Sequence, residues 1–254
     1  MKIDLNCDLG ESFGAYTIGR DADVLPLITS ASIACGWHAG DPVIMEKTVR
    51  LAKENGISAG AHPGFPDLMG FGRRNMTLSA AETRAYILYQ LGALDAFCRS
   101  AGTPLRHVKP HGALYNMAAK DPSLAAAVCD AVKSYNPNLI MLAQESGHLY
   151  KEAVKAGLPA AAEVFADRAY EEDGSLVSRS KPGSMITDPE EVLQRVLGMV
   201  KDHKVTAITG KTIELKADSV CIHGDNEHAV EFAAKIRKTL ADSGIEITPL
   251  YNII

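Results

Sequence analysis

Seven short apolar runs with the character of β-strands alternate with longer segments of helical periodicity along this chain of 254 residues. The strand-like runs cover residues 3–7, 32–35, 57–61, 105–109, 139–142, 161–165 and 219–222. Short buried strands that each lead into a helix are typical of a parallel sheet covered by helices. Because no Pro/Gly/Ser-rich linker interrupts the series, the pattern predicts one α/β domain over residues 1–254.

The starts of four helices are marked by capping residues. Asp41, Asp121 and Asp188 each precede a proline. An aspartate can accept hydrogen bonds from the first free backbone N–H groups, and proline at the first helical position loses no hydrogen bond. Ser79 and Glu82 have the spacing of a capping box. Asp41 is therefore assigned to structure.

Composition limits the classes of partner. The formal net charge of −5 argues against a nucleic-acid-binding surface, which needs an excess of clustered Lys and Arg. A small polar substrate is expected instead.

The cysteines and the N-terminal residues predict a cytoplasmic location. The five cysteines are odd in number and lack the spacing of a zinc or redox motif, so we expect buried free thiols in a reducing compartment. The segment 1–6 carries an acid where a signal peptide has its apolar core, and no run approaches the ~18 apolar residues of a membrane span. We expect a soluble cytoplasmic protein without membrane association.

Four histidines follow predicted strands within a few residues: His38, His62, His111 and His223. Parallel α/β folds collect their chemistry where the strands run out into loops. We therefore expect these imidazoles to belong to one site. His107, inside a predicted strand, is expected to be structural or to support that site.

Two carboxylates and one lysine extend this set. Asp8 and Glu11 follow the first strand, where one could act as a base or both could hold a cation. The alternative is a structural turn or cap. Lys109 ends a strand, and burying its ammonium group is costly unless a carboxylate or another anion pairs with it.

Two long irregular segments, 64–76 and 167–182, are expected to border the site or to close over a substrate. The charged residues of these segments, and an aspartate near the last helix, are candidates for substrate binding: Arg73, Arg74, Asp167, Arg168, Arg179 and Asp225. Capping of the last helix explains Asp225 equally well.

Several common catalytic motifs are absent from the sequence. Gly210-Lys211-Thr212 ends like a phosphate-binding loop, but Val205 stands where the first glycine belongs, and the surrounding residues predict a β-hairpin. There is no Gly-x-Ser-x-Gly elbow and no His-Glu-x-x-His helix. The sequence therefore identifies no nucleotide site.

The polar motifs at the strand ends resemble those of a known family. They are DLNCDLGE at 4–11, CGWHAGD at 35–41, GAHPG at 60–64, GFGRR at 70–74, VKPHGALY at 108–115, FADRAY at 165–170 and HGD at 223–225. Together they resemble the bacterial lactam-utilisation family, LamB/YcsF, whose members are now assigned as the A component of 5-oxoprolinase. The resemblance runs from residue 3 to roughly the C-terminus.

The resemblance implies a (β/α) barrel of about seven strands, related to the glycoside hydrolase and polysaccharide deacetylase group. It also implies ATP-dependent hydrolysis of 5-oxo-L-proline (pyroglutamate) to L-glutamate, carried out with partner subunits B and C. Which of the three components binds ATP is left open.

On this reading we assign catalytic roles by chemistry to Asp8, Glu11, His38, His62, Lys109, His111 and His223. Asp8 or Glu11, with His38, would orient and deprotonate the attacking water. Lys109 and the arginines would hold the substrate carboxylate or phosphoryl charge. His111 or His223 would donate a proton to the leaving nitrogen.

Two other functions fit the same residues. One is a metal-dependent deacetylase of N-acetylated sugars, with a divalent metal held by Asp8, His38 and His62. The other is a non-catalytic component that binds the lactam and delivers it to its partners.

Overall fold

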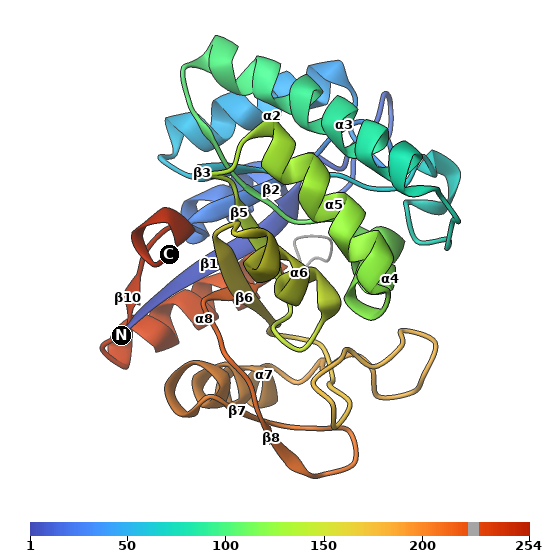
Figure 1. Ribbon diagram of the computed structural model, residues 1–254. Coiled ribbons are helices and arrows are strands. Elements are labelled where there is room, and N and C mark those ends of the chain that lie inside the picture. The colour runs from blue at the N-terminus through green and yellow to red at the C-terminus, as the bar shows by residue number, and fades with distance from the viewer. Residues whose placement is uncertain (223–228) are drawn as a thin grey trace.

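Seven parallel strands close into a barrel in the computed structural model, which describes residues 1–222 and 229–254 (Figure 1). The strands are β1 (Lys2–Leu9), β2 (Ser30–Ala34), β3 (Ser58–His62), β4 (Leu105–Val108), β5 (Ile140–Ala143), β6 (Ala160–Phe165) and β9 (Ser219–Cys221). Their order around the barrel follows the sequence, and β9 pairs with β1 to close the ring. The predicted barrel is confirmed, and each predicted strand end lies within about two residues of the observed one, as expected for element boundaries.

Helices surround the barrel and cover its outer face (Figure 1). The longer ones are α2 (Pro42–Glu54), α3 (Ala80–Ala101), α4 (Gly112–Lys120), α5 (Pro122–Tyr135), α6 (His148–Ala156), α7 (Pro189–Leu197) and α8 (Ala229–Asp242). Shorter helical pieces are α1 (Asp21–Val24), η1 (Leu25–Leu27), η2 (Leu68–Gly70), η3 (Gly198–Asp202) and η4 (Leu250–Asn252). Because the strands are buried between the barrel interior and these helices, β2, β3 and β5 are buried along their whole length.

The predicted helix starts are confirmed. Asp41, Asp121 and Asp188 each accept a hydrogen bond from backbone N–H groups in the first turn of α2, α5 and α7. Ser79 and Glu82 form both hydrogen bonds of a capping box at α3. Asp41 also accepts from the backbone N of Gly14 at 2.8 Å, which agrees with a structural role.

The predicted hairpin lies outside the barrel. β7 (Lys204–Thr206) and β8 (Thr212–Glu214) pair in antiparallel fashion around the loop that contains Gly210. The segment that ends in Gly210-Lys211-Thr212 therefore forms a hairpin and not a phosphate-binding loop, as predicted.

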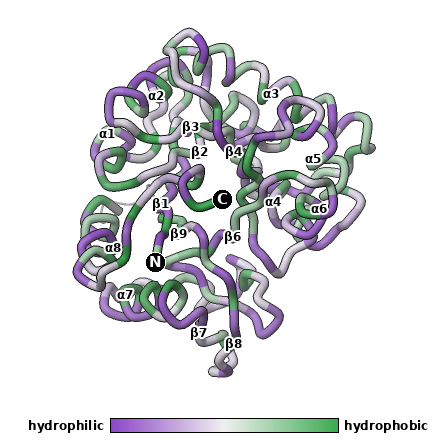
Figure 2. The backbone as a smooth tube through the Cα atoms, turned by 60° about the vertical axis from the view of Figure 1, so that its left-hand side comes forward, coloured by the Kyte–Doolittle hydropathy of each residue, from purple (hydrophilic) through white to green (hydrophobic). Residues whose placement is uncertain are grey.

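The C-terminal segment closes the amino end of the barrel. A short strand that the sequence pattern did not predict, β10 (Glu246–Ile247), pairs with the start of β1, and Leu250 packs against Ile140, Leu142 and Ala161. In Figure 2 the C-terminal end accordingly lies at the centre of the ring of strands. The carboxyl ends of the strands are left as the accessible rim.

A layer of hydrogen-bonded polar groups fills the barrel interior below this rim. The Asp4 carboxylate accepts hydrogen bonds from the hydroxyl groups of Thr29 (2.7 Å), Ser30 (2.6 Å) and Ser219. Burial raises the pKa of Asp4 to about 6, although these hydroxyl groups act in the opposite direction. Asn6, two residues further along β1, donates to Ser219 at 2.8 Å and so connects this layer to the residues above it.

All five cysteines are free and buried, as predicted. Within the described ranges, none of the helices combines the length and the apolar character needed to cross a bilayer.

Candidate functional site

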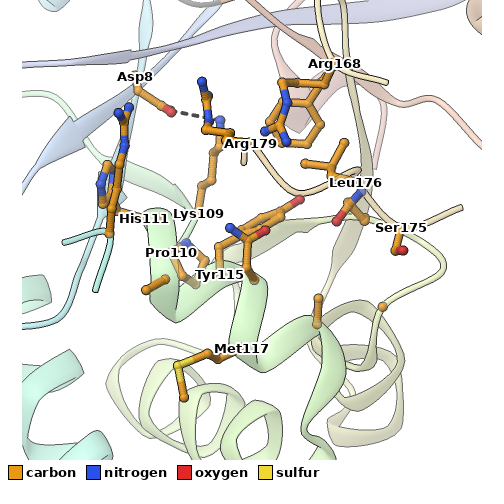
Figure 3. Close-up of a pocket in the computed structure, with 18 of the residues that line it drawn as sticks. Asp8, Lys109, Pro110, His111, Tyr115, Met117, Arg168, Ser175, Leu176 and Arg179 are labelled. Atoms are coloured by element: carbon orange, nitrogen blue, oxygen red, sulfur yellow. Dashed lines mark ion pairs between the residues drawn. The ribbon is translucent and has the colours of Figure 1, made fainter. Parts of the chain in front are cut away.

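A cavity of about 990 Å³ opens at the carboxyl ends of the strands (Figure 3). Five of the residues expected to be catalytic line it: Asp8, Glu11, His62, Lys109 and His111. They come from the ends of β1, β3 and β4, or from the residues just beyond them; β3 pairs with β4, and β2 lies between β1 and β3. The geometry of a parallel barrel therefore brings together groups that lie up to a hundred residues apart in sequence.

Both irregular segments contribute to the cavity wall. Arg73 comes from the segment 64–76, whereas Arg168, Leu176 and Arg179 come from 167–182. Figure 3 shows Asp8 and His111 on one side of the pocket, and Arg168 and Leu176 on the other, with Lys109 between. A carboxylate and imidazoles thus face a wall that carries guanidinium groups.

Lys109 is the most strongly paired charge in the site. Its side chain is only 3% exposed, and its Nζ lies 2.9 Å from Oδ1 of Asp8 and 2.7 Å from Oε1 of Glu163. Nζ also donates to Oδ1 of Asn6 at 3.1 Å. Burial alone would lower the pKa of Lys109, but the neighbouring carboxylates raise it well above its ordinary value. Lys109 is therefore a permanent cation at the floor of the cavity.

Asp8 lies between Lys109 and His62. Its Oδ2 is 3.3 Å from Nε2 of His62, and its side chain is 20% exposed to the cavity. Burial would raise the pKa of Asp8, but the charges of His62 and Lys109 lower it well below its ordinary value. Asp8 is consequently ionised at neutral pH and remains accessible from the cavity.

Glu11, His38, His62 and His111 form a compact cluster beside Asp8, which we call the imidazole cluster. One ligand-type atom from each of the four lies within 4.8 Å of all the others. The rings of His38 and His111 stack with their centroids 3.7 Å apart. His38 is fully buried behind His111, so it reaches the cavity only through its neighbours.

Backbone carbonyl groups fix two of these rings. Nδ1 of His62 donates to the carbonyl of Lys109 at 2.7 Å, and Nε2 of His111 donates to the carbonyl of Phe71 at 2.8 Å. A carbonyl can only accept, so these nitrogens carry hydrogen. The other ring nitrogens, Nε2 of His62 and Nδ1 of His111, face each other at 2.9 Å.

The protonation of the imidazole cluster is uneven. Burial lowers the pKa of His38 and of His111 well below the ordinary value, so both rings are neutral at pH 7. Burial would also lower the pKa of His62, but the Asp8 carboxylate raises it above its ordinary value. Burial raises the pKa of Glu11. Burial therefore disfavours the protonated form of His111, which the proton-donor role expected from the sequence would require, and that role stays a prediction.

Three sequence-based expectations differ from the arrangement in the structure. Arg74 does not line the cavity, because its guanidinium group pairs with Asp67 and its side chain is 67% exposed. Asp167 is also absent from the cavity wall. The predicted metal set contained Asp8, but the cluster that the structure gathers holds Glu11 and His111 in its place, since Asp8 pairs with Lys109.

Arg168 lines the cavity but is also held by its own loop, donating to the carbonyl of Val177 at 2.6 Å. His107 lies inside the barrel with Nε2 3.2 Å from the hydroxyl of Ser32, in keeping with a structural role. His223 and Asp225 lie outside the described residues, and their assignments remain predictions.

Sequence reasoning did not select the residues that hold Lys109 from the far side. Glu163, fully buried on β6, pairs with Lys109 and accepts a hydrogen bond from the Tyr115 hydroxyl at 2.8 Å. Cys221 lies 3.2 Å from Nζ of Lys109. Glu163 is the one charged residue in the otherwise apolar strand β6. It could have been selected on that ground, because a buried lysine needs a carboxylate partner.

The arrangement suits hydrolysis of a small anionic amide. An ionised carboxylate can orient and deprotonate water, and a neighbouring buried ammonium group can stabilise the negative charge that develops on the carbonyl oxygen. Guanidinium groups on the opposite wall can bind a carboxylate or a phosphoryl group. The imidazole cluster, with three nitrogen donors and one oxygen donor, could hold a metal ion.

Comparisons with known proteins identify close relatives. The model of the LamB/YcsF family matches residues 3–254. The A component of a 5-oxoprolinase from Clostridium beijerinckii is 58% identical over 252 residues, which cover 99% of both chains. The crystal structure of a lactam utilization protein from Thermus thermophilus superposes with a TM-score of 0.93 at 49% identity, covering 98% of this chain and 99% of that one.

A more distant structure shares only the fold. A peptidoglycan deacetylase from Bacillus subtilis superposes with a TM-score of 0.51 at 12% identity, covering 99% of this chain and 89% of that one. It agrees with the expected barrel fold.

Proposed function

Because this chain belongs to the LamB/YcsF family, we propose that it acts as the A component of a 5-oxoprolinase and carries the site at which 5-oxo-L-proline is hydrolysed to L-glutamate. The full-length similarity to the same component of a 5-oxoprolinase from Clostridium beijerinckii supports this assignment. The observation that carries the site assignment is the Asp8–Lys109 ion pair on the floor of the cavity.

The chemistry requires activation of the substrate. A five-membered lactam is a nearly strain-free, resonance-stabilised amide and hence a poor electrophile. Phosphorylation of its amide oxygen by ATP would make the carbonyl carbon reactive. Since the sequence contains no Walker A motif, we assign the ATP-dependent step to the assembly with subunits B and C.

This chain's own residues supply the hydrolytic step. Asp8 takes a proton from water as the water oxygen bonds to the carbonyl carbon. Lys109 stabilises the charge on the former carbonyl oxygen, and Arg73 and Arg179 hold the anionic groups of the substrate. The C–N bond then breaks and the nitrogen takes up a proton, for which His223 is one of the two donors expected from the sequence. Cleavage leaves the new carboxyl group as an acyl phosphate, and a second water hydrolyses it to L-glutamate and inorganic phosphate.

The test is ATP-coupled release of glutamate from 5-oxoproline in a mixture of the three subunits. Complete mixtures should form glutamate and ADP together, and omission of this chain should abolish glutamate. If the mixture forms glutamate at the same rate without this chain, the proposal is wrong. A chain that only delivers substrate would still be required, but it would tolerate loss of the Asp8 carboxylate.

A further inference from the structure

We propose that the imidazole cluster is a binding site for one divalent first-row transition metal ion, with Glu11, His38, His62 and His111 as its ligands. Metal binding does not depend on the proposed function. Only the role of the ion in hydrolysis rests on that function.

The separations between the ligand atoms match those of a metal centre. In a four-coordinate site with bonds of 2.0–2.1 Å, ligand atoms lie about 3.3 Å apart. Here Oε1 of Glu11 is 3.1 Å from Nε2 of His38 and 3.3 Å from Nδ1 of His111. Nε2 of His62 is 2.9 Å from Nδ1 of His111 and 4.0 Å from Oε1 of Glu11. Four atoms from four separate segments thus lie within 4.8 Å of one another, close enough for small side-chain movements to bring them onto one ion.

The hydrogen bonds behind the rings direct lone pairs toward that point. Because the outer nitrogens of His62 and His111 donate to backbone carbonyls, their inner nitrogens present lone pairs when the rings are neutral. Two lone pairs facing each other at 2.9 Å need a positive species between them. A proton would satisfy one pair of nitrogens, whereas a metal ion satisfies all four donors.

The backbone holds the rings in place. A Cβ at Gly64 would lie 2.7 Å from Nδ1 of His38, and a Cβ at Gly72 would lie 2.6 Å from Cβ of His38 and 2.8 Å from Cδ2 of His111. Glycine at both positions therefore lets the loops close tightly around the two stacked rings. Rigid packing of this kind preorganises ligands, which a binding site needs and a solvated histidine does not.

The donor set and its surroundings indicate the class of ion. Three imidazoles and one carboxylate suit Zn²⁺ or a similar transition ion, and not Mg²⁺ or Ca²⁺, which prefer oxygen ligands. Glu11, His62 and His111 line the cavity, so both an ion and a substrate can reach the cluster. Asp8, whose Oδ2 is 3.3 Å from Nε2 of His62, borders the ion's position without being one of the four ligands.

Metal binding by the isolated full-length chain tests the site without an activity assay. Protein stripped with a chelator is titrated with Co²⁺, followed by visible absorption, and with Zn²⁺, followed by elemental analysis and thermal unfolding. The expected result is binding of about one ion per chain with a rise in melting temperature, and no comparable effect of Mg²⁺. Failure of folded wild-type protein to bind Co²⁺ or Zn²⁺ would overturn the proposal.

Variants assign the ligands. Glu11→Gln and His111→Asn should each weaken Zn²⁺ binding by at least about tenfold. Loss of a residue that only hydrogen-bonds to a metal ligand already costs that much, so loss of a ligand should cost no less. His203→Asn is the matched control, because His203 is an exposed histidine outside the cluster, at a left-handed backbone position that asparagine tolerates. Circular dichroism verifies that each variant is folded. Unchanged affinity in folded Glu11→Gln and His111→Asn would contradict the assignment.

The catalytic consequence is measured separately in the three-subunit mixture. The stripped chain should release glutamate at least about tenfold more slowly than the metal-loaded chain, and added Zn²⁺ should restore the rate. An equal rate from stripped protein would overturn the role of the ion in hydrolysis. If the loaded chain binds metal but the complete mixture forms no glutamate, the proposed function fails while the metal site stands.

Discussion

Lys109, just beyond β4, and Glu163, within β6, form a buried ion pair with 2.7 Å between Nζ and Oε1. Their side chains are 3% and 0% exposed, respectively. Asp8 lies on the other side of the same ammonium group, so one cation is shared by two carboxylates. The pairing keeps Lys109 charged and fixed in position, which is what stabilisation of a developing oxyanion requires.

Lys109→Met should lower both stability and activity. The variant leaves Glu163 and Asp8 without their cation, so the free energy of unfolding at pH 7 should fall by about 3–5 kcal/mol. Turnover should fall at least about a hundredfold, the scale of one lost catalytic group. Denaturant titration and the glutamate assay measure the two effects.

A second substitution separates these effects. Lys109→Met/Glu163→Gln removes the uncompensated charge of Glu163, so it should recover part of the stability but none of the activity. Lys155→Met is the control, since Lys155 is 74% exposed in its pair with Glu152 and should change stability by no more than about 0.5 kcal/mol. Recovery of turnover in the double variant would contradict the role of Lys109.

Adjacent arginines should differ in their effect on substrate binding. Arg73 lines the cavity, whereas Arg74 pairs with Asp67 outside it. Loss of one charge-assisted contact costs roughly 1.5–3 kcal/mol, so Arg73→Ala should raise KM for the lactam by about tenfold or more. Arg74→Ala should leave KM nearly unchanged. A larger rise in KM for Arg74→Ala would reverse this assignment.

Two glycine substitutions test the packing of the barrel and its outer helices. A Cβ at Gly60 would overlap the His107 ring inside the barrel, so Gly60→Ala should destabilise the protein by several kcal/mol or prevent its folding. Gly92, in the middle of α3, has open space around its Cβ position, and Gly92→Ala should stabilise by about 0.5–1 kcal/mol. Thermal unfolding would show whether the two changes have opposite signs.

Asp4 should make stability depend on pH in a specific direction. Its pKa is about 6 in the folded protein, raised from 3.8, so the folded state holds the proton more tightly than the unfolded state. Stability from this group is fully present below pH ~4 and is lost as pH rises to about 6, by on the order of 2–3 kcal/mol. Asp4→Asn removes this dependence.

The measurement is the difference in unfolding free energy between wild type and Asp4→Asn across that range. Relative to the variant, the wild type should become less stable as pH rises from about 4 to 6, with little further change above. A difference that does not vary with pH would show that Asp4 has an ordinary pKa in the folded protein.

The strands and most of the site were predictable because they depend on local patterns. Short apolar runs that alternate with helical patterns identified the seven barrel strands, and the carboxyl-end rule placed Asp8, His62 and Lys109 together. β10 was missed because two residues carry too little periodicity to be recognised.

What could not be predicted depends on the direction of side chains in three dimensions. Arg73 and Arg74 are neighbours in an irregular loop, where sequence does not say which one faces the cavity. The sequence predicts Asp8 as a metal ligand beside the imidazoles. Its ion pair with Lys109 can be recognised only when β1 and β4 are placed in one barrel. Glu163 required the same long-range information.

The catalytic role of the Asp8 carboxylate is tested by replacing it with the amide of the same shape. Asp8→Asn keeps the volume of the side chain but cannot accept a proton from water, so glutamate release from 5-oxoproline by the three-subunit mixture should fall at least about a hundredfold while the chain stays folded. Release within a few-fold of the wild-type rate would contradict the claim that hydrolysis occurs at the Asp8–Lys109 pair.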